Sequence, residues 1–264
     1  MAAHHRPLVT SPRYPSGVLS APSASVLLPL LPPDASAHGP ALDHQLLLCL
    51  WIILALASLA HILIFLGLIL RRSGSPRDPW AIEYLPLGAL ALLFTALAIH
   101  SEHLWADSRY TGASLEAMQI EVTGMQFAWY FRYPGLDATF GSTRPQLASA
   151  PEGNPIGIDP ADPHSTDDFV TSELVLPAGH EIDLTLRAQD VIHGFSVPEL
   201  RLKQNAIPGE TIHIHFTATK PGTYAILCTQ LCGMGHYRMN ANLRVLPDDE
   251  FENWIEAKEK AAHR

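Results

Sequence analysis

Two long uncharged segments near the N-terminus precede a region in which polar and apolar residues alternate. Leu46 to Leu70 is 25 residues without a formal charge, long enough to cross about 30 Å of hydrocarbon as a helix. A second apolar segment runs from about Trp80 to Ile99, with Glu83 and Pro86 near its start. The pattern predicts a two-helix transmembrane hairpin over residues 39–101.

The connection between the two segments is short and basic. It contains Arg71, Arg72 and Arg77, and arginines in a short loop favour the cytoplasmic side of a membrane. We therefore expect a multi-pass protein whose hairpin ends both face outward. The large remaining domain is then extracytoplasmic, and the lipid bilayer surrounds the hairpin.

Three side chains of the predicted spans need a separate interpretation. His61 and Glu83 are costly at membrane depth and could belong to a proton route. Alternatively, His61 makes a helix-packing hydrogen bond and Glu83 is an interfacial carboxylate. Cys49 is interpreted as a small packing residue.

From about Met118 onward the alternation has the period of half-buried strands, and Pro-Gly pairs separate the runs. Several short strands at this spacing predict an antiparallel β-sandwich over residues 112–247. Residues 136–171, dense in Pro, Gly, Asp and Ser, are interpreted as a long surface insertion. Residues 248–264 are predicted to form an amphipathic helix with one apolar face: Phe251, Trp254 and Ile255.

Residues 1–38 are rich in Pro, Ser and Ala and allow two interpretations. Arginines, a patchy apolar stretch and then Ala35-Ser36-Ala37 resemble a signal peptide with its cleavage site. The prolines make that stretch a poor helix, so a disordered extracytoplasmic extension fits equally well.

The charge is divided unevenly along the chain. Residues 101–264 contain 12 Lys and Arg against 22 Asp and Glu, a net charge of −10. Such an acidic part excludes nucleic acid as a partner and favours a basic one. Three cysteines are too few for a disulfide scaffold, and two of them lie four residues apart.

Those two cysteines lie in a segment rich in soft metal ligands. Cys228, Cys232, His236 and Met239 follow one another within 12 residues, and His193 precedes them. One Cys, two His and a Met suit a blue-copper electron-transfer site on a β-sandwich. The second thiolate allows both sulfurs to bridge two coppers that share one unpaired electron.

Two simpler interpretations compete with copper. A structural zinc site would use the same Cys and His residues but leaves Met239 without a role. A Cys228–Cys232 disulfide is possible in an oxidising compartment, yet it leaves the His and Met residues unexplained. His213 and His215 alternate with apolar residues on one predicted strand and are expected to face solvent.

Over nearly its whole length the chain resembles subunit II of cytochrome c oxidase, through C-x-x-x-C-G-x-x-H-x-x-M and the segment 190–198. The resemblance implies a helical hairpin followed by a Greek-key cupredoxin domain that holds a binuclear CuA centre, in a bacterial plasma membrane. It also implies that both cysteines bridge the metals. One copper is completed by His193 and Met239, the other by His236 and the carbonyl of Gln230.

By the same resemblance, the centre accepts electrons from cytochrome c or a similar donor. It passes them to the haem and copper centres of subunit I, where oxygen is reduced to water and protons are pumped. Phe127 and Trp129 match the family's electron-accepting aromatic strip, although Trp is common at position 127. Asn205 stands where Asp is common.

Two departures concern ions and protons. Gln230 replaces a common Glu that helps to bind magnesium at the subunit I interface, so a weaker magnesium site is expected. Glu83 is not a clean match to the family's proton-channel carboxylate.

Other classes of protein remain in competition. A single-copper carrier and the CuA domain of a nitric oxide reductase both fit part of the pattern. A quinol-oxidase subunit is excluded by the intact ligand set.

Overall fold

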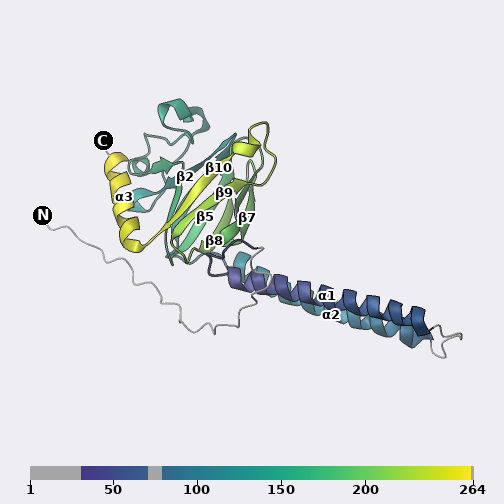
Figure 1. Ribbon diagram of the computed structural model, residues 1–264. Coiled ribbons are helices and arrows are strands. Elements are labelled where there is room, and N and C mark those ends of the chain that lie inside the picture. Colours follow the sequence, from purple (N-terminus) through teal and green to yellow (C-terminus); the bar gives the residue numbers. More distant parts are fainter. Residues whose placement is uncertain (1–30, 71–78, 263–264) are drawn as a thin grey trace.

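The computed structural model describes residues 31–70 and 79–262, so the basic loop at 71–78 and the extension at 1–30 lie outside the described residues. Helix α1 (Gly39–Leu70) and helix α2 (Pro79–Arg109) form a long pair that projects from a β domain (Figure 1). Both helices are long and apolar enough to cross a membrane, by length and composition. The predicted pair of apolar helices is therefore confirmed, and α2 continues to Arg109.

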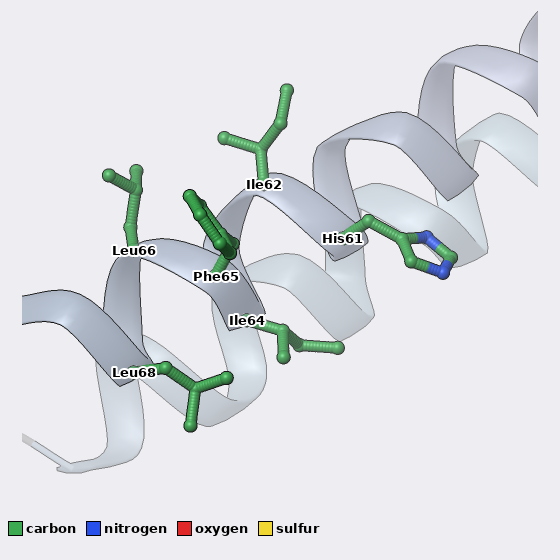
Figure 2. Close-up of a pocket in the computed structure, with 6 residues that line it drawn as sticks. All are labelled: His61, Ile62, Ile64, Phe65, Leu66 and Leu68. Atoms are coloured by element: carbon green, nitrogen blue, oxygen red, sulfur yellow. The ribbon is translucent and has the colours of Figure 1, made fainter.

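The outer surface of the helix pair is apolar. An open hollow on α1 is lined almost entirely by hydrocarbon side chains, shown in Figure 2: His61, Ile62, Ile64, Phe65, Leu66 and Leu68. His61 Nδ1 lies 2.7 Å from the carbonyl oxygen of Ala57, one turn earlier in the same helix. That bond within the helix removes part of the cost of placing an imidazole among apolar groups.

The β domain consists of two five-stranded sheets packed face to face. The first has the order β3-β2-β1-β5-β8, with bounds Phe169–Thr171, Ala128–Tyr133, Met118–Met125, Glu181–Ala188 and Ile212–Thr217. The second has the order β4-β10-β9-β6-β7, with bounds Leu174–Pro177, Asn240–Leu246, Gly222–Cys228, His193–Val197 and Leu202–Ala206.

Inward-facing residues of both sheets form one core. Ile120, Leu184, Phe195, Ile226 and Leu243 are fully buried and belong to a single apolar cluster. Burial of such side chains supplies the main free energy that holds the sheets together. A two-helix hairpin followed by an all-β sandwich was the predicted fold class, and the structure confirms it.

The sheets are mixed, so the prediction of a wholly antiparallel sandwich is wrong. Strand β1 pairs in parallel with β5, and β10 pairs in parallel with β4. Alternation of polar and apolar residues shows which face of a strand is buried, but it is the same for either direction of pairing.

The segment 134–168 leaves the sheet at the end of β2 and returns at β3, as one surface excursion. Arg132, only 1% exposed, holds it in place. Its guanidinium pairs with Glu121 at 2.9 Å and with Asp168, and it donates to the carbonyl of Gly141. These contacts tie both ends of the excursion to the same strand.

Helix α3 (Asp248–Ala262) covers the domain beside β3 and β4. The Trp254 ring lies 5.3 Å from Tyr133 and 5.9 Å from Phe169, centroid to centroid. Phe251 is buried beside it. The apolar face predicted from the sequence is thus the face that packs on the sheet.

The hairpin and the residues just ahead of it contact the β domain, and Arg109 of α2 donates to Gln204 and to the carbonyl of Lys203 on β7. Arg201 makes two 2.8 Å contacts to the carboxylate of Asp43, in the first turns of α1. Ahead of α1, Ala35 is 1% exposed and bonds to Glu199 and Thr219 through its backbone. Residues 35–37 therefore pack against the β domain.

Candidate metal centre

The predicted ligands lie at one end of the second sheet, where three strands meet. Strand β6 begins at His193, β9 ends at Cys228, and β10 begins at Asn240, just after Met239. Phe195 on β6 pairs with Cys228 on β9. Register alone therefore brings the distant His193 beside the first cysteine.

The loop between β9 and β10 folds tightly over this end, and its glycines permit the close approach. Gly233 has φ +138, and an added Cβ would lie 2.8 Å from Gln126 Nε2. A Cβ at Gly235 would lie 2.4 Å from the ring of Phe127. Gln126 Nε2 also donates to the carbonyl of Cys232 at 2.5 Å. The turn before β2 therefore supports the ligand loop.

The sulfur and nitrogen atoms converge. Cys232 Sγ lies 3.9 Å from Cys228 Sγ, 3.6 Å from His236 Nδ1 and 3.7 Å from Met239 Sδ. Among the described residues, His193, Cys228 and Cys232 are the group of metal-ligating side chains whose ligand atoms all lie within 4.8 Å of one another. Both cysteines are free thiols, and 3.9 Å is far longer than a disulfide bond.

The remaining predicted ligand is a backbone atom. The carbonyl oxygen of Gln230 lies 3.2 Å from Cys228 Sγ and accepts from that thiol. All six predicted ligand residues are thus brought to one end of the sheet.

His193 shows that this cluster suits a metal. The residue is completely buried, and its Nε2–H donates to Asp190 Oδ1 at 2.8 Å. Its Nδ1 is buried without a hydrogen-bond partner among the described residues. A buried acceptor without a partner is unfavourable, and this one lies beside two thiols. A soft cation bound there would satisfy Nδ1, the thiolates and the thioether together.

The environment sets the charge of the ligands. Burial raises the pKa of the Cys232 thiol to about 11, and the neighbouring Cys228 adds to the effect. The Cys232 sulfur therefore needs a cation to become a thiolate near neutral pH. Burial opposes ionisation of Asp190, but hydrogen bonds from the Gln126 amide, His193 and the Val191 amide lower its pKa below the ordinary value.

The two aromatic residues of the predicted electron path differ in burial. Trp129 is 1% exposed and contacts His193 edge to face, with ring centroids 5.8 Å apart. Phe127 is only half-buried and lies under the ligand loop, with Arg238 5.8 Å from its ring centre. An aromatic route from the surface to His193 would therefore begin at Phe127.

Sequence reasoning missed the roles of Asp190 and Gln126, which orient His193 and support the Cys232 backbone. The one available signal was the position of Asp190 three residues before a ligand. His213 and His215 lie on β8, in the other sheet. His213 is mostly exposed and contacts Asp183 at 3.2 Å.

Comparison with known proteins decides the family. Residues 118–245 match the family model described as cytochrome C oxidase subunit II, periplasmic domain. The β-sandwich domain therefore belongs to the cytochrome c oxidase subunit II family. The match begins with β1 and ends one residue before the end of β10, so it covers the sandwich and all the converging ligands.

Individual relatives agree with this assignment. The chain is 34% identical over 178 residues to the alternative cytochrome c oxidase subunit 2 of Bradyrhizobium diazoefficiens, covering 67% of this chain and 61% of that protein. It is 38% identical over 135 residues to the cytochrome c oxidase subunit 2 of Thermostichus vulcanus, and this match covers 51% of this chain and 32% of that protein. The chain therefore spans less than two thirds of the length of either relative.

Among solved structures, the periplasmic domain of subunit II of the Bradyrhizobium japonicum cytochrome oxidase is similar. It is 29% identical, with a TM-score of 0.41, and the match covers 55% of this chain and 94% of that one.

Proposed function

We propose that this subunit II relays electrons in a respiratory cytochrome c oxidase. Its centre takes single electrons from cytochrome c and passes them to the haem and copper centres of subunit I, where oxygen is reduced to water with proton pumping. The observation that carries the proposal is the unpartnered, buried Nδ1 of His193, which lies beside Cys228 and Cys232.

Six residues would hold two coppers. Cys228 and Cys232 supply shared thiolates, His193 and Met239 complete one metal, and His236 with the Gln230 carbonyl completes the other. The convergence of their sulfur and nitrogen atoms supports this assignment. When bound, a copper pair bridged by thiolates exchanges single electrons with little change in geometry.

The protein itself supplies rigidity and exclusion of water. Asp190 holds the His193 ring in one orientation through Nε2–H, which is how carboxylates commonly fix metal-bound histidines. Trp129 and Phe195 pack edge to face 5.3 Å apart behind that ring. Ligands held in fixed positions, three of which (His193, Cys232 and Met239) are buried, lower the reorganisation that accompanies each electron.

We also propose the setting. The apolar hairpin spans a bacterial plasma membrane, with the β domain outside, and its surface contacts lipid and the haem-containing subunit I. Because Gln230 provides an amide where a carboxylate would bind a hard cation better, any interface magnesium is held mainly by subunit I.

Metal counting tests the proposal. Full-length protein in detergent, loaded with copper and dialysed, should retain two coppers per chain and show an electron delocalised over both nuclei by electron paramagnetic resonance. A single copper would indicate a copper carrier. Retention of zinc in preference to copper would indicate a structural zinc site and refute the electron-relay function.

A further inference from the structure

The negative charge of the extracytoplasmic part is confined to two segments. Residues 134–173 and 248–262 contain 13 Asp and Glu against three Lys and Arg, a net charge of −10. Residues 101–264 as a whole contain 22 Asp and Glu against 12 Lys and Arg, which is also a net charge of −10. The remaining residues of 101–264 contain nine acidic and nine basic side chains, so their net charge is zero. The excursion with the following β3 and Glu173, together with helix α3, therefore accounts for all of the excess.

Both segments lie at the end of the sandwich opposite the ligands. Strand β10 starts beside Met239 and ends at Leu246, and α3 begins two residues later. Seven residues at about 3.3 Å each separate the two ends by roughly 20 Å. Strand β2 likewise contacts His193 through Trp129 near its start and enters the excursion after Tyr133. Figure 1 shows α3 and the β9–β10 loop on opposite sides of the domain.

The two acidic segments adjoin one another, because Trp254 of α3 packs on Tyr133 and Phe169 at the two ends of the excursion. We call their exposed carboxylates the acidic face: Asp137, Glu152, Asp248, Asp249, Glu250, Glu252 and Glu256.

The ligand end is different in character. Met234 and Tyr237, here called the ligand-loop patch, are 94% and 85% exposed. Large apolar side chains this exposed on one short loop are typical of an interaction surface. The loops around the ligands carry few charges, and two of these are occupied: Asp190 accepts three hydrogen bonds, and Arg238 lies over Phe127.

These two surfaces have opposite consequences for an electron donor. Charges are screened within about 8 Å at physiological ionic strength, so the acidic face exerts little attraction at the ligand end. A basic protein would instead be held at the acidic face, roughly 20 Å from the ligands, too far for efficient electron transfer. The net charge of the domain therefore gives a misleading guide to its donor.

We propose that the electron donor docks on the ligand-loop patch, and that it is a small redox protein whose redox group is bordered by apolar, uncharged residues. This inference rests on the proposed electron-relay function and specifies its partner. Apolar contact positions the donor, and electrostatic steering contributes little.

Stopped-flow reduction of the copper centre in the purified oxidase tests this inference. Two donor cytochromes are compared, one with a basic docking face and one with an uncharged face, between about 0.01 M and about 0.15 M ionic strength. We expect the uncharged donor to react faster at about 0.15 M, with a rate constant that changes less than about twofold over the range.

Two sets of variants locate the docking site. Met234→Gln with Tyr237→Ser should lower the second-order rate constant about tenfold, with an unchanged copper spectrum. The matched control, Asp249→Asn with Glu250→Gln and Glu252→Gln on the acidic face, should leave it unchanged.

Three results would overturn the inference. One is that the basic donor reduces the copper centre faster than the uncharged donor, with a rate constant that falls steeply as the salt concentration rises. Another is that the acidic-face variant lowers the second-order rate constant while the Met234→Gln, Tyr237→Ser variant leaves it unchanged. The third is loss of other subunits from the purified Met234→Gln, Tyr237→Ser complex, which would make the patch a subunit interface. Failure of the proposed function is distinct, since no reductant would then reduce a copper centre in the chain.

Discussion

The Nε2–H of His193 donates to Asp190 Oδ1 across 2.8 Å, which leaves the buried Nδ1 of the same ring as the nitrogen available to a metal. Replacing Asp190 by Asn weakens that acceptor and loosens the orientation of the ring. We expect the copper dissociation constant to rise about 10- to 100-fold, measured by competition with a chelator.

The control for this change is Asp183→Asn, because Asp183 contacts the exposed His213 on β8 instead of a ligand. Its copper affinity should equal that of the wild type. Equal affinity in Asp190→Asn would mean that the backbone alone orients His193.

Cys228 distinguishes a two-copper site from a one-copper site. In Cys228→Ser one bridging thiolate becomes a hydroxyl, which is a poor ligand for a soft metal. The protein should then hold one copper, and its hyperfine pattern should simplify to that of a single nucleus in electron paramagnetic resonance. Two coppers with an unchanged pattern would refute the bridging role.

Gln230 concerns magnesium at the subunit I interface. In Gln230→Glu the backbone carbonyl beside Cys228 is kept while a carboxylate is added. We expect the assembled oxidase to bind manganese more tightly, as followed by electron paramagnetic resonance, with copper content unchanged. Tight manganese in the wild type that is lost in Gln230→Ala would contradict this.

Arg132 stabilises the domain through buried ion pairs. Arg132→Met leaves the buried Asp168 without its ion-pair partner and leaves Glu121 with Arg187 alone, and loss of one member of such a network costs about 3–5 kcal/mol. Chemical denaturation followed by tryptophan fluorescence measures the loss. Lys260→Met serves as control, because Lys260 and Glu256 are 73% and 63% exposed where they pair, and it should cost less than about 1 kcal/mol. Similar losses in both variants would disprove the role of burial.

His38 precedes α1, and burial lowers its pKa from the ordinary value of 6.5 despite the opposing effect of Asp34. The folded state therefore favours the neutral ring. That contribution to stability is complete above pH 6.5 and is lost as the pH falls through the lowered pKa. Thermal unfolding should show wild type losing stability relative to His38→Gln as the pH decreases below 6.5. A difference independent of pH would argue against this linkage.

The local features of this protein were predictable from the sequence. Four ligands lie within 12 consecutive residues, so their chemistry and spacing are visible without a fold. The apolar spans and the packed face of α3 follow from composition and helical periodicity, which are properties of single segments.

The tertiary structure alone decided what depends on pairs of distant segments. Packing of one sheet on the other brought Trp129 to His193 and Gln126 to Cys232, and strand pairing joined β1 and β5 in parallel. Residue alternation specifies a buried face but no neighbour. In the same way, composition determined the net charge of −10, whereas only the course of β2 and β10 placed that charge at the end away from the ligands, because electrostatic effects depend on distance.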